Sequence, residues 1–208
     1  MTDAQSDATD PDIFLASASP RRAELLERMG VRFRTVPQAV DERIEPDETP
    51  EVFVIRLALE KARAGLHARP AGATAPVLGA DTAVVIDDEI LGKPADRDQA
   101  LTMLDRLAGR THRVVTGVAL LDEDREMTRL SLSMVTLREL AGAEKAAYWQ
   151  SGEPADKAGA YAIQGRGGVF IEQLEGSYSG VMGLPLFETY DLLGEFGIDY
   201  QSRWPAGQ

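Results

Sequence analysis

The chain has 208 residues, 44% of them hydrophobic, which is enough for a full core arranged as one large domain or two closely joined lobes. Its formal net charge of −12 argues against a general DNA- or RNA-binding surface, because neutralising phosphates requires basic patches. The sequence contains no cysteine, which excludes disulfides and thiolate nucleophiles, and no apolar stretch of membrane-spanning length, so a cytoplasmic protein without membrane partners is expected.

The chain is predicted to begin with a polar segment and then a strand and a helix. Residues 1–12 are acidic, without the basic and apolar regions of a signal peptide, and predict a disordered tail; residues 13–208 are predicted to form a single domain. The apolar run 13–16 predicts a short buried strand. Ser19 suits an N-cap, Pro20 the first helical position, and Gly30 the left-handed residue that ends a helix.

Two arginines occupy the first turn of this predicted helix. The unpaired N–H groups and the macrodipole make a helix N-terminus positive, so Arg21 and Arg22 are each disfavoured there by about 0.3–1 kcal/mol. A bound anion would convert both side chains into ligands, alongside the free backbone N–H groups. The pattern therefore indicates an anion site at the start of the helix.

The middle of the chain alternates helices and strands. Residues 31–48 are expected to be irregular, and Thr49 opens a helix whose predicted apolar stripe is Val52, Ile55, Leu59, Ala62 and Leu66. The segment "PVLGADTAVVIDDEILGKP" (76–94) predicts a long strand, a turn at Asp87-Asp88 and a short return strand. A third helix is predicted from Asp96 to Leu107.

The C-terminal half is predicted to continue with a hairpin and further helices. Strand-like runs at 113–121 and 129–137 flank a polar turn, and shorter elements are expected at 143–150 (helix), 169–171 (strand) and 185–196 (helix). Because strands and helices mix throughout and neighbouring strands are expected to be antiparallel, we predict an α/β fold with a mixed sheet and flanking helices, rather than a doubly wound parallel sheet.

Asp81 is the most unusual residue of the long predicted strand. It interrupts an apolar run, where a carboxylate is costly unless it is paired, hydrogen-bonded or bound to a metal. Lys61 shares a flank of the second predicted helix with apolar residues, where it either meets a partner or extends to water. Taken singly, Glu42, Lys93 and Gln164 are ordinary loop residues.

Several common site motifs are absent from the sequence. The dinucleotide-binding glycine pattern, the P-loop and the serine nucleophile elbow do not occur in the sequence. The sequence has only two histidines, His67 and His112, and this small number argues against a histidine-based zinc site or catalytic triad. The remaining cations and acids, together, suit several phosphates and a divalent ion such as Mg²⁺ or Mn²⁺. From the residues alone we predict a phosphate-handling enzyme. The residues are Arg21, Arg22, Lys61, Lys93, Asp81 and Glu42.

These motifs closely resemble the Maf family of nucleoside triphosphate pyrophosphatases, once named for inhibition of septum formation. The resemblance runs from about residue 13 to residue 196. It rests on "LASASPRR" (15–22), "VDE" (40–42), "LALEKA" (57–62), "LGADTAVV" (78–85), "GKP" (92–94), "KAGAYAIQG" (157–165) and "GLPLFETYDLL" (183–193).

The resemblance implies an elongated α/β fold with two lobes around a central cleft, as in Maf and ITPase-like proteins. It also implies metal-dependent hydrolysis of a nucleotide to its monophosphate and pyrophosphate. It implies Asp81 as the catalytic acid or base, with Glu42 and Asp81 also expected as ligands of Mg²⁺ or Mn²⁺. A homodimer is also implied. The residues expected to bind substrate are Ser19, Arg21, Arg22, Lys61, Thr82, Lys93 and Gln164.

Three positions point to one branch of the family. Arg21, Thr82 and Gln164 resemble the branch that prefers dTTP and UTP, whereas the 7-methyl-GTP branch has an aromatic residue, glutamine and glutamate there. Gly180 departs from the family, which often has asparagine at that position. Two other interpretations stay open: a pyrophosphatase for modified or non-standard nucleotides, and a nucleotide-binding regulator of cell division without turnover.

Overall fold

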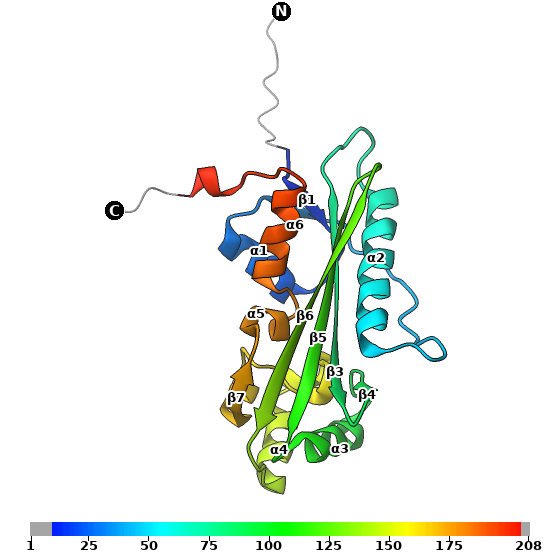
Figure 1. Cartoon of the computed structure of the whole chain (residues 1–208). Coiled ribbons are helices and arrows are strands. Elements are labelled where there is room, and N and C mark those ends of the chain that lie inside the picture. Colours follow the sequence, from blue (N-terminus) through cyan, green and yellow to red (C-terminus); the bar gives the residue numbers. More distant parts are fainter. Residues whose placement is uncertain (1–9, 205–208) are drawn as a thin grey trace, which may run out of the picture.

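The computed structural model describes residues 10–204, so residues 1–9 of the predicted tail and residues 205–208 of the predicted domain lie outside the described part. It shows a twisted sheet with helices packed against it in an elongated molecule (Figure 1). Within residues 10–204, no helix is long and apolar enough to cross a membrane.

Asp12, the last residue of the predicted tail, contacts the folded part of the chain. Its carboxylate accepts hydrogen bonds from the backbone and side chain of Arg32.

The structure contains seven strands and six α-helices among the described residues. The strands are β1 (Ile13–Leu15), β2 (Phe33–Thr35), β3 (Val77–Ile86), β4 (Glu89–Leu91), β5 (Thr111–Leu121), β6 (Glu126–Leu137) and β7 (Ile171–Glu175). The α-helices are α1 (Pro20–Met29), α2 (Pro50–Ala68), α3 (Arg97–Leu107), α4 (Gly142–Gln150), α5 (Tyr178–Met182) and α6 (Leu186–Glu195). Short 3-10 turns are η1 (Glu153–Asp156), η2 (Ala158–Ala160), η3 (Arg166–Phe170) and η4 (Gln201–Arg203).

The sheet is mixed, which confirms the predicted fold class. Its strand order is β2-β1-β3-β5-β6-β7, and β4 pairs with the end of β3. Strand β1 runs parallel to both β2 and β3, and every other pair is antiparallel. The long strands β3, β5 and β6 run the length of the molecule and join its two ends (Figure 1).

Local sequence explains where several elements begin and end. The Thr49 side chain accepts a hydrogen bond from the Val52 N–H and starts α2, and the Asp96 carboxylate accepts from the Gln99 N–H and starts α3. Asp87 and Asp88 both have positive φ, which gives the tight turn between β3 and β4 the twist that a two-residue hairpin needs. These predicted boundaries are confirmed.

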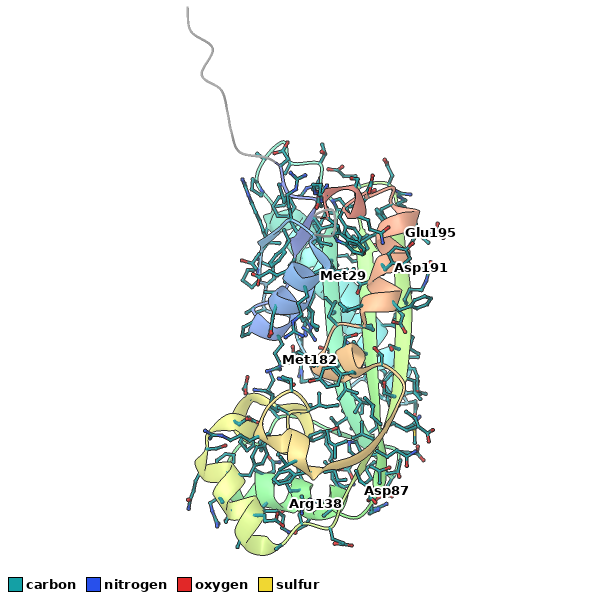
Figure 2. The ribbon with its side chains drawn as sticks, turned by 90° about the vertical axis from the view of Figure 1, so that its left-hand side faces the viewer. Met29, Asp87, Arg138, Met182, Asp191 and Glu195 are labelled. Carbon is teal, nitrogen blue, oxygen red and sulfur yellow. The ribbon has the colours of Figure 1, made fainter. Side chains whose placement is uncertain are left out.

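Two hydrophobic clusters occupy opposite ends of one face of the sheet. One lies between β1, α1, α6 and the adjoining parts of β3 and β5, and the other lies under α3 and α4. In Figure 2, Met29 and Glu195 lie toward the first end and Asp87 and Arg138 at the other, with Met182 between them. Helix α2 covers the opposite face of β3 and β5 with its own smaller clusters.

Glycines allow α2 to approach the sheet closely. A Cβ atom added to Gly79 would lie 2.1 Å from the Ala58 carbonyl oxygen, and one added to Gly117 would lie 2.6 Å from the Val54 carbonyl oxygen. The helix backbone therefore rests directly on β3 and β5. This contact places the flank of α2 that carries Lys61 against the middle of β3.

Three details of the predicted elements are wrong. The buried face of α2 is formed by residues 53, 54, 57, 58, 61, 62 and 65, so Ala62 of the predicted stripe is buried but Val52 is 56% exposed. The helix has two apolar stripes, and the close contact at the glycines selects the one with small residues. Residues 31–48 contain the short strand β2, and residues 166–170 form a 3-10 turn, so that β7 begins only at Ile171.

Candidate active site

All nine predicted site residues line one cavity of about 640 Å³. They come from the start of α1, the loop before α2, the middle of α2 and β3, the loop after β4, and the segment between η2 and η3. The cavity is therefore assembled from parts of the chain that are far apart in sequence. The nine residues are Ser19, Arg21, Arg22, Glu42, Lys61, Asp81, Thr82, Lys93 and Gln164.

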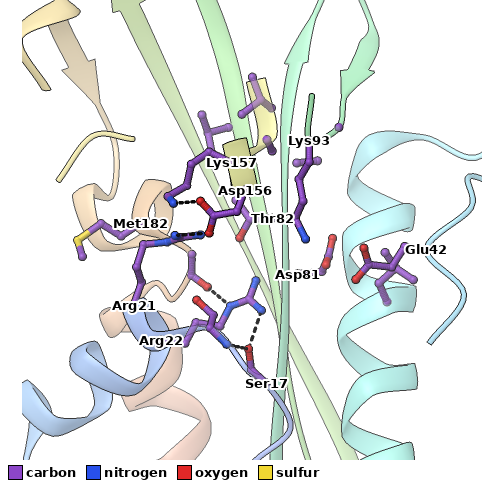
Figure 3. A pocket seen from close by; sticks show the side chains of 18 of the residues that line it. Ser17, Arg21, Arg22, Glu42, Asp81, Thr82, Lys93, Asp156, Lys157 and Met182 are labelled. Atoms are coloured by element: carbon purple, nitrogen blue, oxygen red, sulfur yellow. Dashed lines mark hydrogen bonds and ion pairs between the residues drawn. The ribbon is translucent and has the colours of Figure 1, made fainter. Parts of the chain in front are cut away.

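The start of α1 presents Arg22 to this cavity. Arg22 Nε donates to the Gly183 carbonyl oxygen at 2.8 Å, and its Nη1 donates to Ser17 Oγ at 3.1 Å (Figure 3). The loss of water contact around the guanidinium lowers the pKa of Arg22, although the charge of Asp81 opposes this shift. Neutral oxygens hold Arg22 in place and leave its charge available for an anion.

The N-terminus of α1 carries no acidic residue in its first turn. Ser19 occupies the N-cap position, as predicted, but within residues 10–204 its side chain makes no capping hydrogen bond. The Ser19 N–H donates to Ser17 Oγ at 3.1 Å instead. The helix start keeps the positive character that the sequence indicated, and it faces the cavity.

Lys61 joins the two predicted acidic residues. Its Nζ lies 2.6 Å from Asp81 Oδ1 and 2.7 Å from Glu42 Oε1. Lys61 and Asp81 are both buried, whereas the Glu42 side chain is about half exposed. Figure 3 shows Glu42 directed from the loop beside α2 toward Asp81 on β3. The partner of the buried lysine is therefore the aspartate that interrupts the apolar strand.

The two carboxylates differ in their proton affinity. Burial raises the pKa of Asp81 above its ordinary value and outweighs the charges of Lys61 and Arg22. Burial also acts to raise the pKa of Glu42, but the hydrogen bond and charge of Lys61, helped by Lys93, outweigh it and lower that pKa. The pKa values of two acids that share one ammonium group are thus shifted in opposite directions.

The cavity is positive in an acidic protein. Five cations and three carboxylates line it, which gives a formal charge of +2, against −12 for the whole chain. Lys93 lowers the pKa of Glu42 through its charge, and among the described residues it pairs with no carboxylate. The cavity therefore attracts anions that the rest of the surface repels.

Thr82 and Gln164 lie in the same cavity with different surroundings. Thr82 Oγ1 lies 3.0 Å from the hydroxyl of Thr116, which donates to the Gly180 carbonyl oxygen at 2.8 Å. The carbonyl group of Gly180 thus holds the Thr116 hydroxyl that contacts Thr82. Gly180 is the position noted above where the family often has asparagine. No described residue hydrogen-bonds the Gln164 side-chain amide, so its donor and acceptor remain available to a ligand.

Sequence reasoning missed several residues that line the cavity. Asp156 binds Lys157 and lies 3.6 Å from Arg21, and the Tyr161 hydroxyl lies 2.8 Å from Nε2 of the buried His112. Lys157 and Tyr161 belong to the quoted "KAGAYAIQG" segment, so their proximity to Gln164 was the signal that could have identified them.

A family model and two similar proteins indicate the family to which this chain belongs. The family model described as "Maf-like protein" matches residues 12–196. A protein named dTTP/UTP pyrophosphatase from Alkalilimnicola ehrlichii is 62% identical over 197 residues, covering 93% of this chain and 97% of that protein. A protein of the same name from Escherichia coli O157:H7 is 48% identical over 191 residues, covering 92% and 96% respectively.

One solved structure has a weaker similarity. A HAM1 protein from Coxiella burnetii has a TM-score of 0.47 and 18% identity, covering 88% of this chain and 98% of that one, which is too distant to bear on the activity. The family model and the close relatives span most of the described chain. The protein is a member of the Maf family, as its motifs predicted.

Proposed function

We propose that this protein hydrolyses dTTP and UTP to the nucleoside monophosphate and pyrophosphate. The observation that carries the proposal is the cavity charge of +2, built from five cations, in a chain of net charge −12. A triphosphate is the kind of ligand that such a cluster binds, because several cations match several phosphates. The name shared by the two relatives, dTTP/UTP pyrophosphatase, agrees with this substrate class.

The phosphates would bind between α1 and the opposite wall of the cavity. Arg21, Arg22 and the free N–H groups at the start of α1 provide one set of contacts. Lys61 and Lys93 provide positive charge from α2 and the loop after β4. In this arrangement the charge of the departing pyrophosphate is balanced before the bond breaks, which lowers the barrier electrostatically.

Glu42 and Asp81 fit a divalent cation, Mg²⁺ or Mn²⁺. Both carboxylates already converge on a single positive charge, the ammonium group of Lys61, at 2.7 and 2.6 Å. Among residues 10–204, no group of three or more histidines, cysteines or acids could hold a metal by itself, so phosphate oxygens would complete the ligand set. When bound, the ion would neutralise negative charge on the phosphates.

The opposite pKa shifts support different roles for the two acids in the reaction. Glu42, with its lowered pKa, stays anionic and suits a metal ligand. Asp81, with its raised pKa, is the better proton acceptor and would take a proton from the water that attacks the α-phosphorus. Its Oδ1 accepts from Lys61, and no described residue hydrogen-bonds Oδ2, which leaves that oxygen for the water.

Gln164 would read the base. Its amide offers a donor and an acceptor, which match the O4 acceptor and the N3–H donor shared by uracil and thymine. Because no described residue uses these groups, binding a pyrimidine costs no existing protein hydrogen bond. A glutamate at this position would only accept, and would favour bases that present donors.

The test is pyrophosphate release by the purified protein from dTTP, UTP, CTP, GTP, ATP and 7-methyl-GTP, each with Mg²⁺, Mn²⁺ or chelator. We expect metal-dependent release mainly from dTTP and UTP. Release mainly from other or modified nucleotides would contradict the substrate assignment, and tight binding without release would contradict hydrolysis.

A further inference from the structure

Asp156 holds two cations at the edge of the cavity. It ends η1, and its carboxylate binds the ammonium group of the following residue, Lys157. The same carboxylate lies 3.6 Å from Nη1 of Arg21, which reaches it from α1 on the opposite wall. Figure 3 shows the ammonium group of Lys157 and the guanidinium of Arg21 meeting the carboxylate of Asp156. The result is an ion-pair bridge between two walls that the chain builds from distant segments.

This acid has a different setting from the other two in the cavity. Glu42 and Asp81 share Lys61 and suit metal binding and proton transfer. Among the described residues, the Asp156 carboxylate instead pairs with two cations that face the phosphate region, Arg21 and Lys157. Partial burial acts to raise the pKa of Asp156, yet the hydrogen bond from Lys157 and the charges of Lys157 and Arg21 outweigh it and lower that pKa. Asp156 is therefore an anion at neutral pH.

We propose that Asp156 is a built-in competitor of the substrate, an anion that occupies Arg21 and Lys157 until phosphates displace it. The proposal rests on the proposed function, and it adds Lys157 as a phosphate-binding residue. In the free protein the carboxylate neutralises both cations. In the complex the phosphates bind both cations, and the Asp156 side chain turns toward solvent.

The exposure of these residues makes such an exchange feasible. The Asp156 side chain is 66% exposed, so its rotation into water meets little obstruction, whereas Lys157 is 13% exposed and stays at the cavity wall. Ion pairs to an exposed carboxylate are weak, because water competes for its oxygens, and a multiply charged phosphate group can bind both cations more strongly. By the same competition Asp156 weakens the hold on the pyrophosphate product and favours its release.

The chain offers a closely matched control. Lys145 is also 13% exposed and is bound by Asp105, which is 60% exposed, but this pair lies outside the cavity. We would measure binding of inorganic pyrophosphate by calorimetry to the wild type, Asp156→Asn and Asp105→Asn. We expect Asp156→Asn to bind pyrophosphate about three- to tenfold more tightly, since two weak ion pairs no longer oppose binding. Asp105→Asn should bind like the wild type.

The outcomes separate this inference from the proposed function. Unchanged or weaker pyrophosphate binding by Asp156→Asn, or no binding by any of the three proteins, would overturn the competitor role. An equal gain in Asp105→Asn would also overturn it, because it would reflect net charge alone. The proposed function is judged separately by nucleotide hydrolysis in the wild type, which does not depend on either substitution.

Discussion

Asp81 and Glu42 share one lysine that acts to lower both of their pKa values, but burial outweighs it only at Asp81, and this difference supports our assignment of the base. We predict that Asp81→Asn lowers turnover of dTTP by at least about 100-fold, the usual contribution of a positioned general base. The substitution preserves side-chain shape, and Glu42 still pairs with Lys61, so the fold should persist. Steady-state kinetics and circular dichroism measure the two effects. Turnover near that of the wild type would refute the role of Asp81.

The raised pKa of Asp81 also predicts the acid limb of the pH profile. Burial favours the protonated carboxyl group, so Asp81 loses its ability to accept a proton at a higher pH than an ordinary aspartate, whose pKa is about 3.9. We expect kcat/KM to decline as the pH falls, with an apparent pKa above that value. A decline with an apparent pKa at or below it would show that the environment of Asp81 does not control the reaction.

Gln164 provides a test of base recognition that is independent of the chemistry. Gln164→Glu replaces the amide donor with an acceptor, so we expect kcat/KM for dTTP and UTP to fall about 10- to 100-fold, in line with the loss of a hydrogen bond and an unmatched acceptor. Thermal unfolding should be little changed, because no described residue hydrogen-bonds this side chain. An unaltered preference across the six nucleotides would contradict the role of Gln164.

The sequence alone could single out a residue as functional only where that residue conflicts with its local secondary structure. Arg21 and Arg22 conflict with the dipole of their helix, and Asp81 conflicts with its apolar strand, so sequence alone singled them out. Asp156 breaks no such rule. Its significance comes from Arg21, which lies 135 positions away in the sequence, and no local pattern encodes that contact.

Among the elements, α2 positions the buried Lys61 because its backbone rests on two glycines of the sheet. We predict that Gly79→Ala destabilises the fold by about 1–3 kcal/mol or more and lowers activity, since the new Cβ atom would lie 2.1 Å from the Ala58 carbonyl oxygen and push α2 away. Urea denaturation compares it with Gly142→Ala, whose Cβ would meet nothing within 4 Å. Equal stability of the two variants would contradict the close-packing argument.

Most elements follow from local signals, but their contacts do not. The caps at Thr49 and Asp96 and the turn at Asp87-Asp88 were readable because each satisfies a backbone requirement on its own. Helix α2 has two apolar stripes, and only the packing at Gly79 and Gly117 selects the buried one. Strand β2 has three residues, is largely exposed and depends on pairing with β1, so no periodicity marks it.

At the scale of the whole molecule, the sheet joins two hydrophobic clusters and leaves a positive cavity between the elements that surround it. Composition predicted an acidic chain with a full core, and the family motifs predicted nine of the residues that line the cavity. Neither could supply the charge balance at the cavity edge. That balance arises because Arg21 of α1 and Asp156 of η1 meet only in the folded chain.

The most direct test of the central claim is hydrolysis of UTP in ¹⁸O-labelled water, with mass analysis of both products. We predict that the label enters UMP and that pyrophosphate stays unlabelled, because water attacks the α-phosphorus. Label in pyrophosphate, or release of orthophosphate with UDP, would contradict the account.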